Sequence, residues 1–276
     1  MAMTINTNVL SINAQRNAST TNNSLATSLQ RLSSGLRVNG AKDDAAGLAI
    51  ANRMDAQARG MNVAVRNSND GISLVQTAES GMAVIGDMLQ RMRELAVQAT
   101  NGTNTSSDLS AINSEYTELY SEINRTMSSV EFNGTSLLDT TATFSFQIGA
   151  NSGQTVDIAS GSLSVSAGIG AMSGSSAIDT TATSANASAI DAIDTAIDSI
   201  NTSRATLGAI QNRFNYTVSY LQAASENQQA ARGRIMDADF AVETANLSRA
   251  QILQQAGTAM VAQANQLPQG VLALLR

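Results

Sequence analysis

The sequence predicts a mainly α-helical protein, a long helical bundle or coiled coil built from both ends of the chain, with a small β-hairpin region in the middle. Apolar residues recur at steps of three, four and seven along most of the 276 residues, which places them on one face of a helix. Aromatic residues make up only 3 % of the chain, so Ala, Ile, Leu, Val and Met must form the core, a mixture that suits helices packed side by side.

The segment from residue 3 to residue 36 is weakly amphipathic. Its leucines follow a spacing of four, three and four, which is typical of a helical seam. We therefore expect a helix that docks on a partner, with a flexible tail as the alternative. Asn39-Gly40 then predicts a turn, and Asp43 or Asp44 can cap the next helix. The segment has two apolar patches, Ile5, Val9 and Ile12, then Leu25, Leu29, Leu32 and Leu36.

A long helix is predicted over residues 45–99, about 80 Å in length at 1.5 Å per residue. Asn69-Asp70-Gly71 resembles a turn, but the seven-residue phase continues across it, so we expect an uninterrupted helix. After a loop at 101–107, Thr105 and Asp108 predict the capped start of a second helix, which returns antiparallel and ends before Asn133-Gly134. The seven-residue phase is carried by Met54, Met61, Ser68, Val75, Met82, Leu89 and Ala96.

The residues from about 135 to 187 have a different pattern. Apolar and polar residues alternate in three short runs, which predicts strands in hairpins. The last part, 167–188, is rich in Gly, Ser, Ala and Thr, and we expect it to lie on the surface and to tolerate insertions. The alternating apolar residues are Phe144, Phe146 and Ile148, then Val156 and Ile158, then Leu163 and Val165.

Helix is predicted again from Ala189 to a break near 231–236, and once more from Asp239 to the end. Pro268 and Gly270 are expected to break or kink this last helix. A lone helix cannot hide its apolar stripe from water, so the last segment needs partners, namely the other end of the chain and other copies of the molecule. The stripe consists of Phe240, Leu247, Ala250, Leu253, Ala256, Met260, Ala264, Leu267, Val271 and Leu274.

This pattern predicts two domains. Residues 1–43 and 236–276 form a terminal coiled-coil domain, and residues 44–235 form a helical body that carries the β-hairpin region at about 135–187.

Composition argues against several classes of function. The chain has no His and no Cys, which removes the commonest general base, the commonest metal ligand and thiolate chemistry, so we predict no catalytic, cofactor or metal site. The net charge is −6 and Lys42 is the only lysine, so the basic footprint of a nucleic-acid-binding protein is missing. The beginning lacks the basic and apolar regions of a signal peptide, and no apolar run is long enough to span a membrane.

Four long motifs resemble bacterial flagellin, in the same order: AMTINTNVLSINAQRN near the start, RLSSGLRVNGAKDDAAGLAIANR at 31–53, NSNDGISLVQTAESGM at 67–82, and SRAQILQQAGTAMVAQANQLPQGVLALLR at the end. The resemblance implies a subunit that polymerises into the helical filament used for swimming. Its terminal segments would pair as a coiled coil in the inner tube of the filament, and the helical body would form the outer tube. The middle is too short for large outer domains, which implies a thin, smooth filament. The inner-tube packing residues would be Ile5, Val9, Ile12, Leu25, Leu29, Leu32, Leu253, Met260, Leu267, Val271 and Leu274.

The resemblance also implies partners and a location. The protein would leave the cell unfolded through the flagellar type III export channel, without a cleaved signal peptide, and reside in the extracellular filament. Besides other copies of itself, its partners would be an export chaperone, a filament cap protein and hook-associated proteins. The segment LQRMRELAVQ resembles the one that an animal Toll-like receptor grips, while packing against the next subunit in the outer tube is the structural role of the same residues, Gln90, Arg91, Glu94, Leu95 and Gln98.

Three other functions are weighed against a filament subunit. A hook-filament junction protein shares the terminal pattern, but its motifs are usually weaker than those seen here. A secreted helical protein that inserts in membranes would explain the apolar ends, yet the polar face is Asn, Gln and Ser, not Lys and Arg. An enzyme is disfavoured because the candidate carboxylates are explained as helix caps, at Asp43, Asp44, Asp237 and Asp239.

Overall fold

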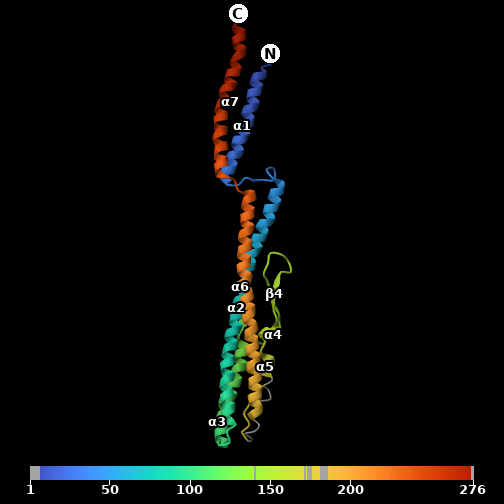
Figure 1. Ribbon diagram of the computed structural model, residues 1–276, viewed down its shortest axis with the longest axis vertical. Coiled ribbons are helices and arrows are strands. Elements are labelled where there is room, and N and C mark those ends of the chain that lie inside the picture. Colours follow the sequence, from blue (N-terminus) through green and yellow to red (C-terminus); the bar gives the residue numbers. More distant parts are fainter. Residues whose placement is uncertain (1–6, 140, 171, 173–175, 181–185, 275–276) are drawn as a thin grey trace. The chain divides into compact units, whose positions relative to one another are not determined.

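The computed structural model describes residues 7–139, 141–170, 172, 176–180 and 186–274. The chain divides into two compact units: Met1–Ala56 with Asn227–Arg276, and Gln57–Glu226. Two long helices, α2 (Ala45–Ala99) and α6 (Asn186–Met236), contribute to both units (Figure 1). Within the described residues, no helix has the length and hydrophobicity needed to cross a membrane.

In the first unit, α1 (Val9–Ser34) lies beside α7 (Phe240–Leu274), as Figure 1 shows. The Asn8 side chain caps α1 by accepting a hydrogen bond from the Ser11 N–H, and Gly35 ends the helix in the left-handed conformation (φ 72°), which glycine adopts without strain. Asp239 caps α7, since its Oδ1 accepts from the N–H groups of Ala241 and Val242. The predicted break at Pro268 is absent, because α7 continues to Leu274; proline removes one backbone donor, and the neighbouring turns stay helical.

Short polar contacts join the ends of these helices. Leu36 pairs with Asp237 as an antiparallel bridge, and the Ala238 N–H donates to the Gly35 carbonyl at 2.9 Å. Of the two aspartates predicted as caps, Asp44 caps α2, with its Oδ1 2.7 Å from the Gly47 nitrogen. Asp43 instead stabilises the preceding turn. A small apolar cluster completes this part of the unit, formed by Val38, Ala51 and Met236 with Leu36, Leu48 and Ile235 around it.

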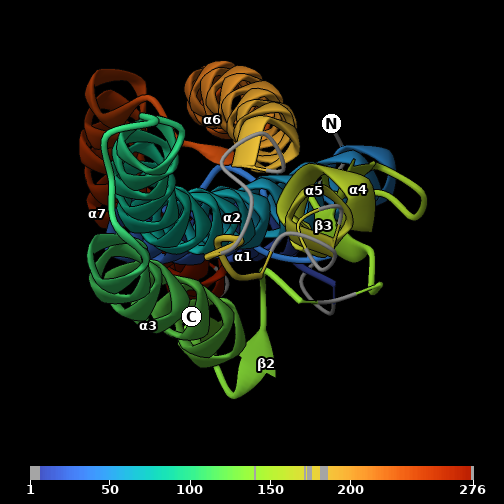
Figure 2. The same ribbon diagram turned by 90° about the horizontal axis from the view of Figure 1, so that it is seen from below.

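In the second unit, α2, α3 (Ser106–Ser129) and α6 surround one apolar core, and Figure 2 shows α3 beside α2. The predicted uninterrupted helix over 45–99 is confirmed. The capping pair of α3 is also confirmed: the Asp108 N–H donates to Thr105 Oγ1, and the Thr105 N–H donates to Asp108 Oδ2 at 3.0 Å. Five apolar residues at steps of seven along α6 are buried in this unit, namely Ile193, Ile200, Leu207, Phe214 and Leu221.

Two small antiparallel sheets follow α3. The first pairs β1 (Glu131–Phe132) with β2 (Thr135–Ser136), and the second pairs β3 (Phe144–Gln147) with β4 (Thr155–Ile158). Phe146 of β3 meets Phe214 of α6 edge to face, with ring centroids 5.7 Å apart. The second hairpin is thereby held against the helical core.

The prediction of a third strand at Leu163 and Val165 is wrong. This segment forms two short helices, α4 (Ser160–Leu163) and α5 (Ser166–Gly170), and both side chains are buried in the core. Helical turns satisfy their own backbone hydrogen bonds, so the segment needs no partner strand to bury these side chains.

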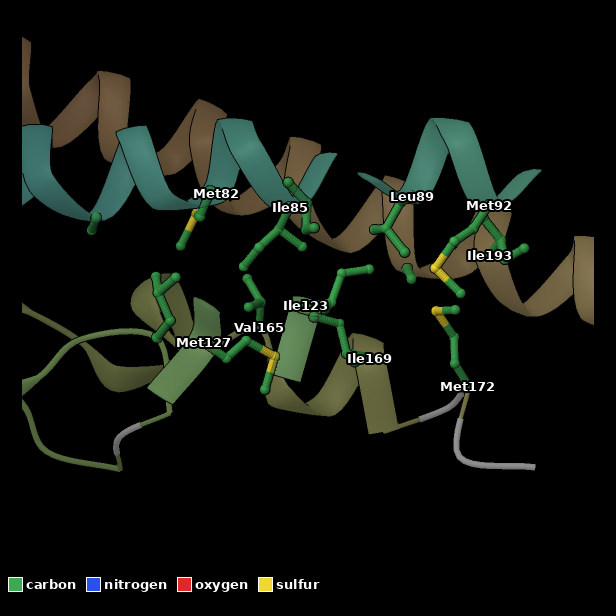
Figure 3. Close-up of a cluster of buried hydrophobic side chains, with 14 of the residues drawn as sticks. Met82, Ile85, Leu89, Met92, Ile123, Met127, Val165, Ile169, Met172 and Ile193 are labelled. Atoms are coloured by element: carbon green, nitrogen blue, oxygen red, sulfur yellow. The ribbon is translucent and has the colours of Figure 1, made fainter. Parts of the chain in front are cut away.

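The prediction that 167–188 lies on the surface is also wrong at several positions, since Ile169, Met172, Ile178 and Asn186 are buried. Figure 3 shows Met172 pointing toward Met92 of α2.

Candidate assembly surfaces

The contact between α1 and α7 is a coiled-coil seam of mostly small side chains. The least exposed positions of both helices recur at alternating steps of three and four, as in a coiled coil. A Cβ built on Gly257 would lie 3.6 Å from the Cβ of Ala18, so the two backbones approach closely at this point. We call these positions the intrachain seam; they are Ser11, Ala14, Ala18, Thr21, Leu25, Ser28 and Leu32 on α1, and Glu243, Leu247, Ala250, Gln254, Gly257, Val261 and Ala264 on α7.

Polar contacts fix the register of this seam. Asn8 Nδ2 donates to the Ala264 carbonyl at 2.7 Å, and Gln254 Nε2 donates to Asn22 Oδ1 at 3.0 Å. The start of α1 therefore lies beside the far end of α7, and the helices are antiparallel. These bonds match specific positions rather than simply burying apolar area, so they select one register among several.

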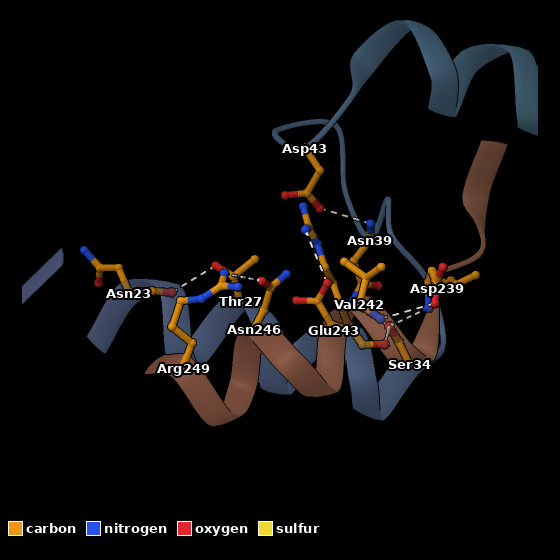
Figure 4. A network of polar contacts seen from close by, with 12 residues as sticks. Asn23, Thr27, Ser34, Asn39, Asp43, Asp239, Val242, Glu243, Asn246 and Arg249 are labelled. Atoms are coloured by element: carbon orange, nitrogen blue, oxygen red, sulfur yellow. Dashed lines mark hydrogen bonds and ion pairs between the residues drawn. The ribbon is translucent and has the colours of Figure 1, made fainter. Parts of the chain in front are cut away.

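One charge pair lies in the same seam. Arg31 Nη1 is 3.9 Å from Glu243 Oε2, and Glu243 is buried, whereas Arg31 is about one third exposed. Figure 4 shows Glu243 among the polar residues of α1 and α7. Arg31 Nε is buried without a hydrogen-bond partner among the described residues. The pair borders a groove of about 490 Å³ between the helices, which is lined mostly by polar residues.

Large apolar side chains lie on the outer faces of both helices. Val9 is 62 % exposed and Met260 is 59 % exposed. Burying such side chains is favourable by roughly 25 cal/mol for each Å² removed from water, so these faces gain stability when another surface covers them. We call them the outer apolar faces of α1 and α7; they comprise Val9, Leu10, Ile12 and Leu29, and Phe240, Val242, Ile252, Leu253 and Met260.

The residues predicted for inner-tube packing therefore divide into two groups. Leu25 and Leu32 are half-buried in the intrachain seam, whereas Val9, Ile12, Leu29, Leu253 and Met260 belong to the outer apolar faces. Ile5 and the side chains of Leu267, Val271 and Leu274 lie outside what the structure describes.

The predicted stripe included Ala250 and Ala264, but reasoning from large apolar residues missed Ala14, Ala18 and the Ser, Thr and Gly positions of the seam. Their own alternation of three and four was the signal that could have found them.

The second unit carries the other predicted surface, on α2. Gln90, Arg91, Glu94 and Gln98 are exposed, but Leu95 is only 2 % exposed and packs in the core. A partner protein could not reach the Leu95 side chain without opening this unit. Leu95 instead fixes the helix face that presents its exposed neighbours.

Ion pairs tie this surface to the adjoining helices. Arg91 bonds to Glu94 and to Glu115 of α3, at 2.8 and 2.9 Å, and these carboxylates raise the pKa of its guanidinium. Arg93 Nε donates to Asp194 Oδ1 of α6 at 2.6 Å, which lowers the pKa of that carboxyl. A shallow cavity of about 520 Å³ lies between the exposed side chains, lined by Gln90, Arg93, Glu94, Val97 and Gln98.

Comparison with protein families gives two matches. Residues 5–143 match the bacterial flagellin N-terminal helical region, and residues 190–275 match the bacterial flagellin C-terminal helical region. The residues between the two matches, 144–189, contain the second hairpin and the short helices α4 and α5.

Individual relatives extend over the whole chain. A flagellin of Halalkalibacterium halodurans is 48 % identical over 276 residues, covering 99 % of this chain and 100 % of that protein. The flagellar filament 33 kDa core protein of Treponema phagedenis is 42 % identical over 286 residues, with 99 % and 100 % covered.

A solved structure is also similar. The crystal structure of Bacillus cereus flagellin matches with a TM-score of 0.51 at 32 % identity, over 60 % of this chain and 94 % of that one. Two family matches at the two ends, full-length relatives and a shared fold all agree, and the chain belongs to the bacterial flagellin family.

Proposed function

We propose that this flagellin polymerises by packing the outer apolar faces of α1 and α7 against other copies of the chain, while the intrachain seam holds the two helices together. A flagellin is the structural subunit of the extracellular filament of the bacterial flagellum, and this is the function of the chain. Contacts between unlike faces of successive copies build a helical filament when the rotation from one copy to the next does not close into a ring.

One observation carries the proposal. The seam between α1 and α7 contains mostly small and polar residues besides Leu25, Leu32, Leu247 and Val261, while nine large apolar side chains of the two helices stay exposed outside it. A helix pair that existed only to pack against itself would place its large apolar residues in the seam. The observed arrangement leaves them available to neighbouring subunits.

A double substitution tests this function. In Leu253→Ser with Met260→Ser, both changes lie on the outer face of α7, so we expect the variant to stay helical by circular dichroism and to form few filaments under negative-stain microscopy after seeding. Gln251→Ser with Gln263→Ser is the matched control, because both glutamines are exposed and polar on the same helix. Filaments of normal yield from the first variant would refute the assignment of this face.

We also propose the two-domain plan for the filament. Residues 1–43 and 236–276 would form the inner tube, and residues 44–235 would form the outer tube, with Gln90, Arg91, Glu94 and Gln98 in its packing. Deleting Leu253–Arg276 would then leave a folded body that cannot polymerise. A deletion variant that formed filaments of normal yield would contradict this plan.

Receptor recognition is a second role for the surface on α2. Because Leu95 is buried, we assign direct contact to the exposed Gln90, Arg91, Glu94 and Gln98. Gln90→Ala is the informative variant, since Gln90 lines the shallow cavity and Arg91 does not. We expect weaker binding to the ectodomain of a flagellin-sensing Toll-like receptor with unchanged helicity; unchanged binding would remove Gln90 from the contact.

The remaining partners follow from the flagellin family. We propose export without a cleaved signal peptide, a chaperone that holds the C-terminal segment before export, a cap protein at the growing tip, hook-associated proteins at the base, and no catalytic activity. Deleting the gene separates a major filament subunit from a hook-filament junction protein. Loss of all filament indicates the former, and secretion of unpolymerised subunits indicates the latter.

A further inference from the structure

The chain contains three Asn-Gly steps, at Asn39, Asn101 and Asn133, and all three lie outside helices. Asparagine before glycine can lose ammonia without an enzyme, because the glycine backbone nitrogen can attack the carbonyl carbon of the asparagine side chain. Glycine has no Cβ to block this approach. Since the three steps share the same dipeptide, any difference in their reactivity depends largely on how the structure restrains each glycine nitrogen.

Two of the three steps are restrained. Asp43 Oδ2 accepts from both the Asn39 N–H and the Gly40 N–H, at 3.0 and 3.1 Å, as Figure 4 shows for the bond from Asn39. Asn39 Nδ2 also donates to Ser34 Oγ at 3.3 Å, so both the attacking nitrogen and the leaving amino group are engaged.

Asn133 and Gly134 form the two-residue turn between β1 and β2, at φ 51° and 76°. This is the left-handed backbone of a tight hairpin turn. For the nitrogen of Gly134 to reach the side chain of Asn133, the backbone would have to rotate out of this conformation. That rotation would disrupt the pairing of Phe132 with Thr135, so the hairpin protects this step.

The step at Asn101 is open. It lies in the loop between α2 and α3, and Asn101, Gly102 and Thr103 are all exposed. In the described part of the chain, no oxygen accepts a hydrogen bond from the Gly102 N–H, and a Cβ built at Gly102 would meet no atom within 4 Å. The Asn101 Oδ1 accepts a long hydrogen bond of 3.4 Å from the Thr103 N–H, which withdraws electron density from the carbon under attack.

We propose that Asn101 is the site where this protein deamidates spontaneously, ahead of Asn39 and Asn133. A bond forms between the Gly102 nitrogen and Asn101 Cγ, the Cγ–Nδ2 bond breaks, and the side-chain nitrogen leaves as ammonia with the proton of the Gly102 amide. Solvent water then opens the cyclic imide to aspartate or isoaspartate. The new carboxylate lies next to the carbonyl end of α2, where negative charge is unfavourable.

Peptide mass spectrometry of the full-length protein, held in warm, mildly alkaline buffer, follows the conversion of each asparagine to an acid. We expect Asn101 to react several-fold faster than Asn39 and Asn133. Gly102→Ala should slow deamidation at Asn101 alone, because the new Cβ hinders the attack of the nitrogen of residue 102. The loop has room for the methyl group, so the fold is unchanged. Asp43→Ala should accelerate deamidation at Asn39 alone, and Asn101 in the same molecule is the internal standard. If circular dichroism shows that Asp43→Ala loses helix, Asp43→Ser is used in its place.

In concentrated urea the three rates should converge, because the restraints at Asn39 and Asn133 are lost. The proposal is overturned if Asn39 or Asn133 reacts as fast as Asn101 in the folded protein. It is also overturned if Asp43→Ala leaves the rate at Asn39 unchanged, or if the folded-state order persists in urea.

Discussion

At the scale of single residues, two glycines of α2 should respond in opposite ways to the same methyl group. A Cβ on Gly71 would lie 2.8 Å from Cζ of the buried Phe214, whereas a Cβ on Gly86 would meet nothing within 4 Å. Replacing an unhindered helical glycine by alanine stabilises a protein by about 0.5–1 kcal/mol, and overpacking a core costs about 1–3 kcal/mol. We expect Gly86→Ala to raise the urea midpoint and Gly71→Ala to lower it. A raised midpoint for both variants would show that Phe214 moves aside freely.

The ion pair between Arg93 and Asp194 gives a pH-dependent prediction. The hydrogen bond and the charge of Arg93 lower the pKa of Asp194 below its ordinary value of 3.8, so the unfolded chain binds its proton first as the pH falls. The stabilisation by this pair is therefore present above the unfolded pKa and is lost as the pH falls through the folded pKa. Asp194→Asn should lower stability at neutral pH and have a smaller effect at pH ~2, below the unfolded pKa.

Urea unfolding of the wild type and of Asp194→Asn at both pH values measures this difference. Asp191→Asn is the control, because Asp191 lies on the same helix and forms no ion pair among the described residues. A difference between wild type and Asp194→Asn that stays constant with pH would contradict the assignment. The pair is exposed, so its contribution to stability is small.

At the scale of elements, Met172 tests whether the segment after β4 belongs to the core. Figure 3 shows its side chain facing Met92 and Ile193, and it is completely buried. Met172→Ala should cost about 2–5 kcal/mol, whereas the volume-conserving Met172→Leu should cost less than about 1.5 kcal/mol. Thermal or urea unfolding distinguishes these effects. If neither variant changed the stability, the segment would lie on the surface, as its composition predicted.

The helices were predictable because each carries a long periodic signal with a local start or stop. The seven-residue phase across Gly71 and the capping pair Thr105 with Asp108 needed no tertiary information. The segment around Leu163 and Met172 was not predictable in this way. Its few apolar residues are separated by Gly and Ser, so their spacing fits strand, loop and short helix equally well. Only packing in the core with residues of other elements selects the helical turns.

The seam of α1 and α7 was predicted as a contact but not as a surface of small residues. The stripe predicted for the last helix places large apolar residues such as Leu253 and Met260 in the seam, because burial usually favours them there. In α7, Leu253 and Met260 lie on the outer face, and Gln254 and Gly257 occupy the seam between them. The sequence of one chain does not show which face of a helix is covered by another helix of the same chain and which is covered by a neighbouring subunit. That distinction is a property of the assembly.

At the scale of the whole molecule, the seam of small residues predicts that α1 and α7 are stable only in the polymer. Each buried Ser, Ala or Gly removes little apolar area from water, so the lone pair of helices gains little to offset the entropy of ordering them. The core of the second unit instead buries Met82, Ile85 and Leu89 completely.

Hydrogen exchange of the dilute monomer should therefore show rapid exchange along α1 and α7 and slow exchange in α2 near these three residues. Seeded filaments should protect α1 and α7 and leave α2 little changed, because polymerisation covers Leu253 and Met260 with other copies. The Leu253→Ser, Met260→Ser variant, incubated with seeds, should keep the monomer pattern. Amides of α1 and α7 that were as protected in the monomer as those of α2 would mean that the intrachain seam is sufficient, and that the outer apolar faces do not supply the missing stability.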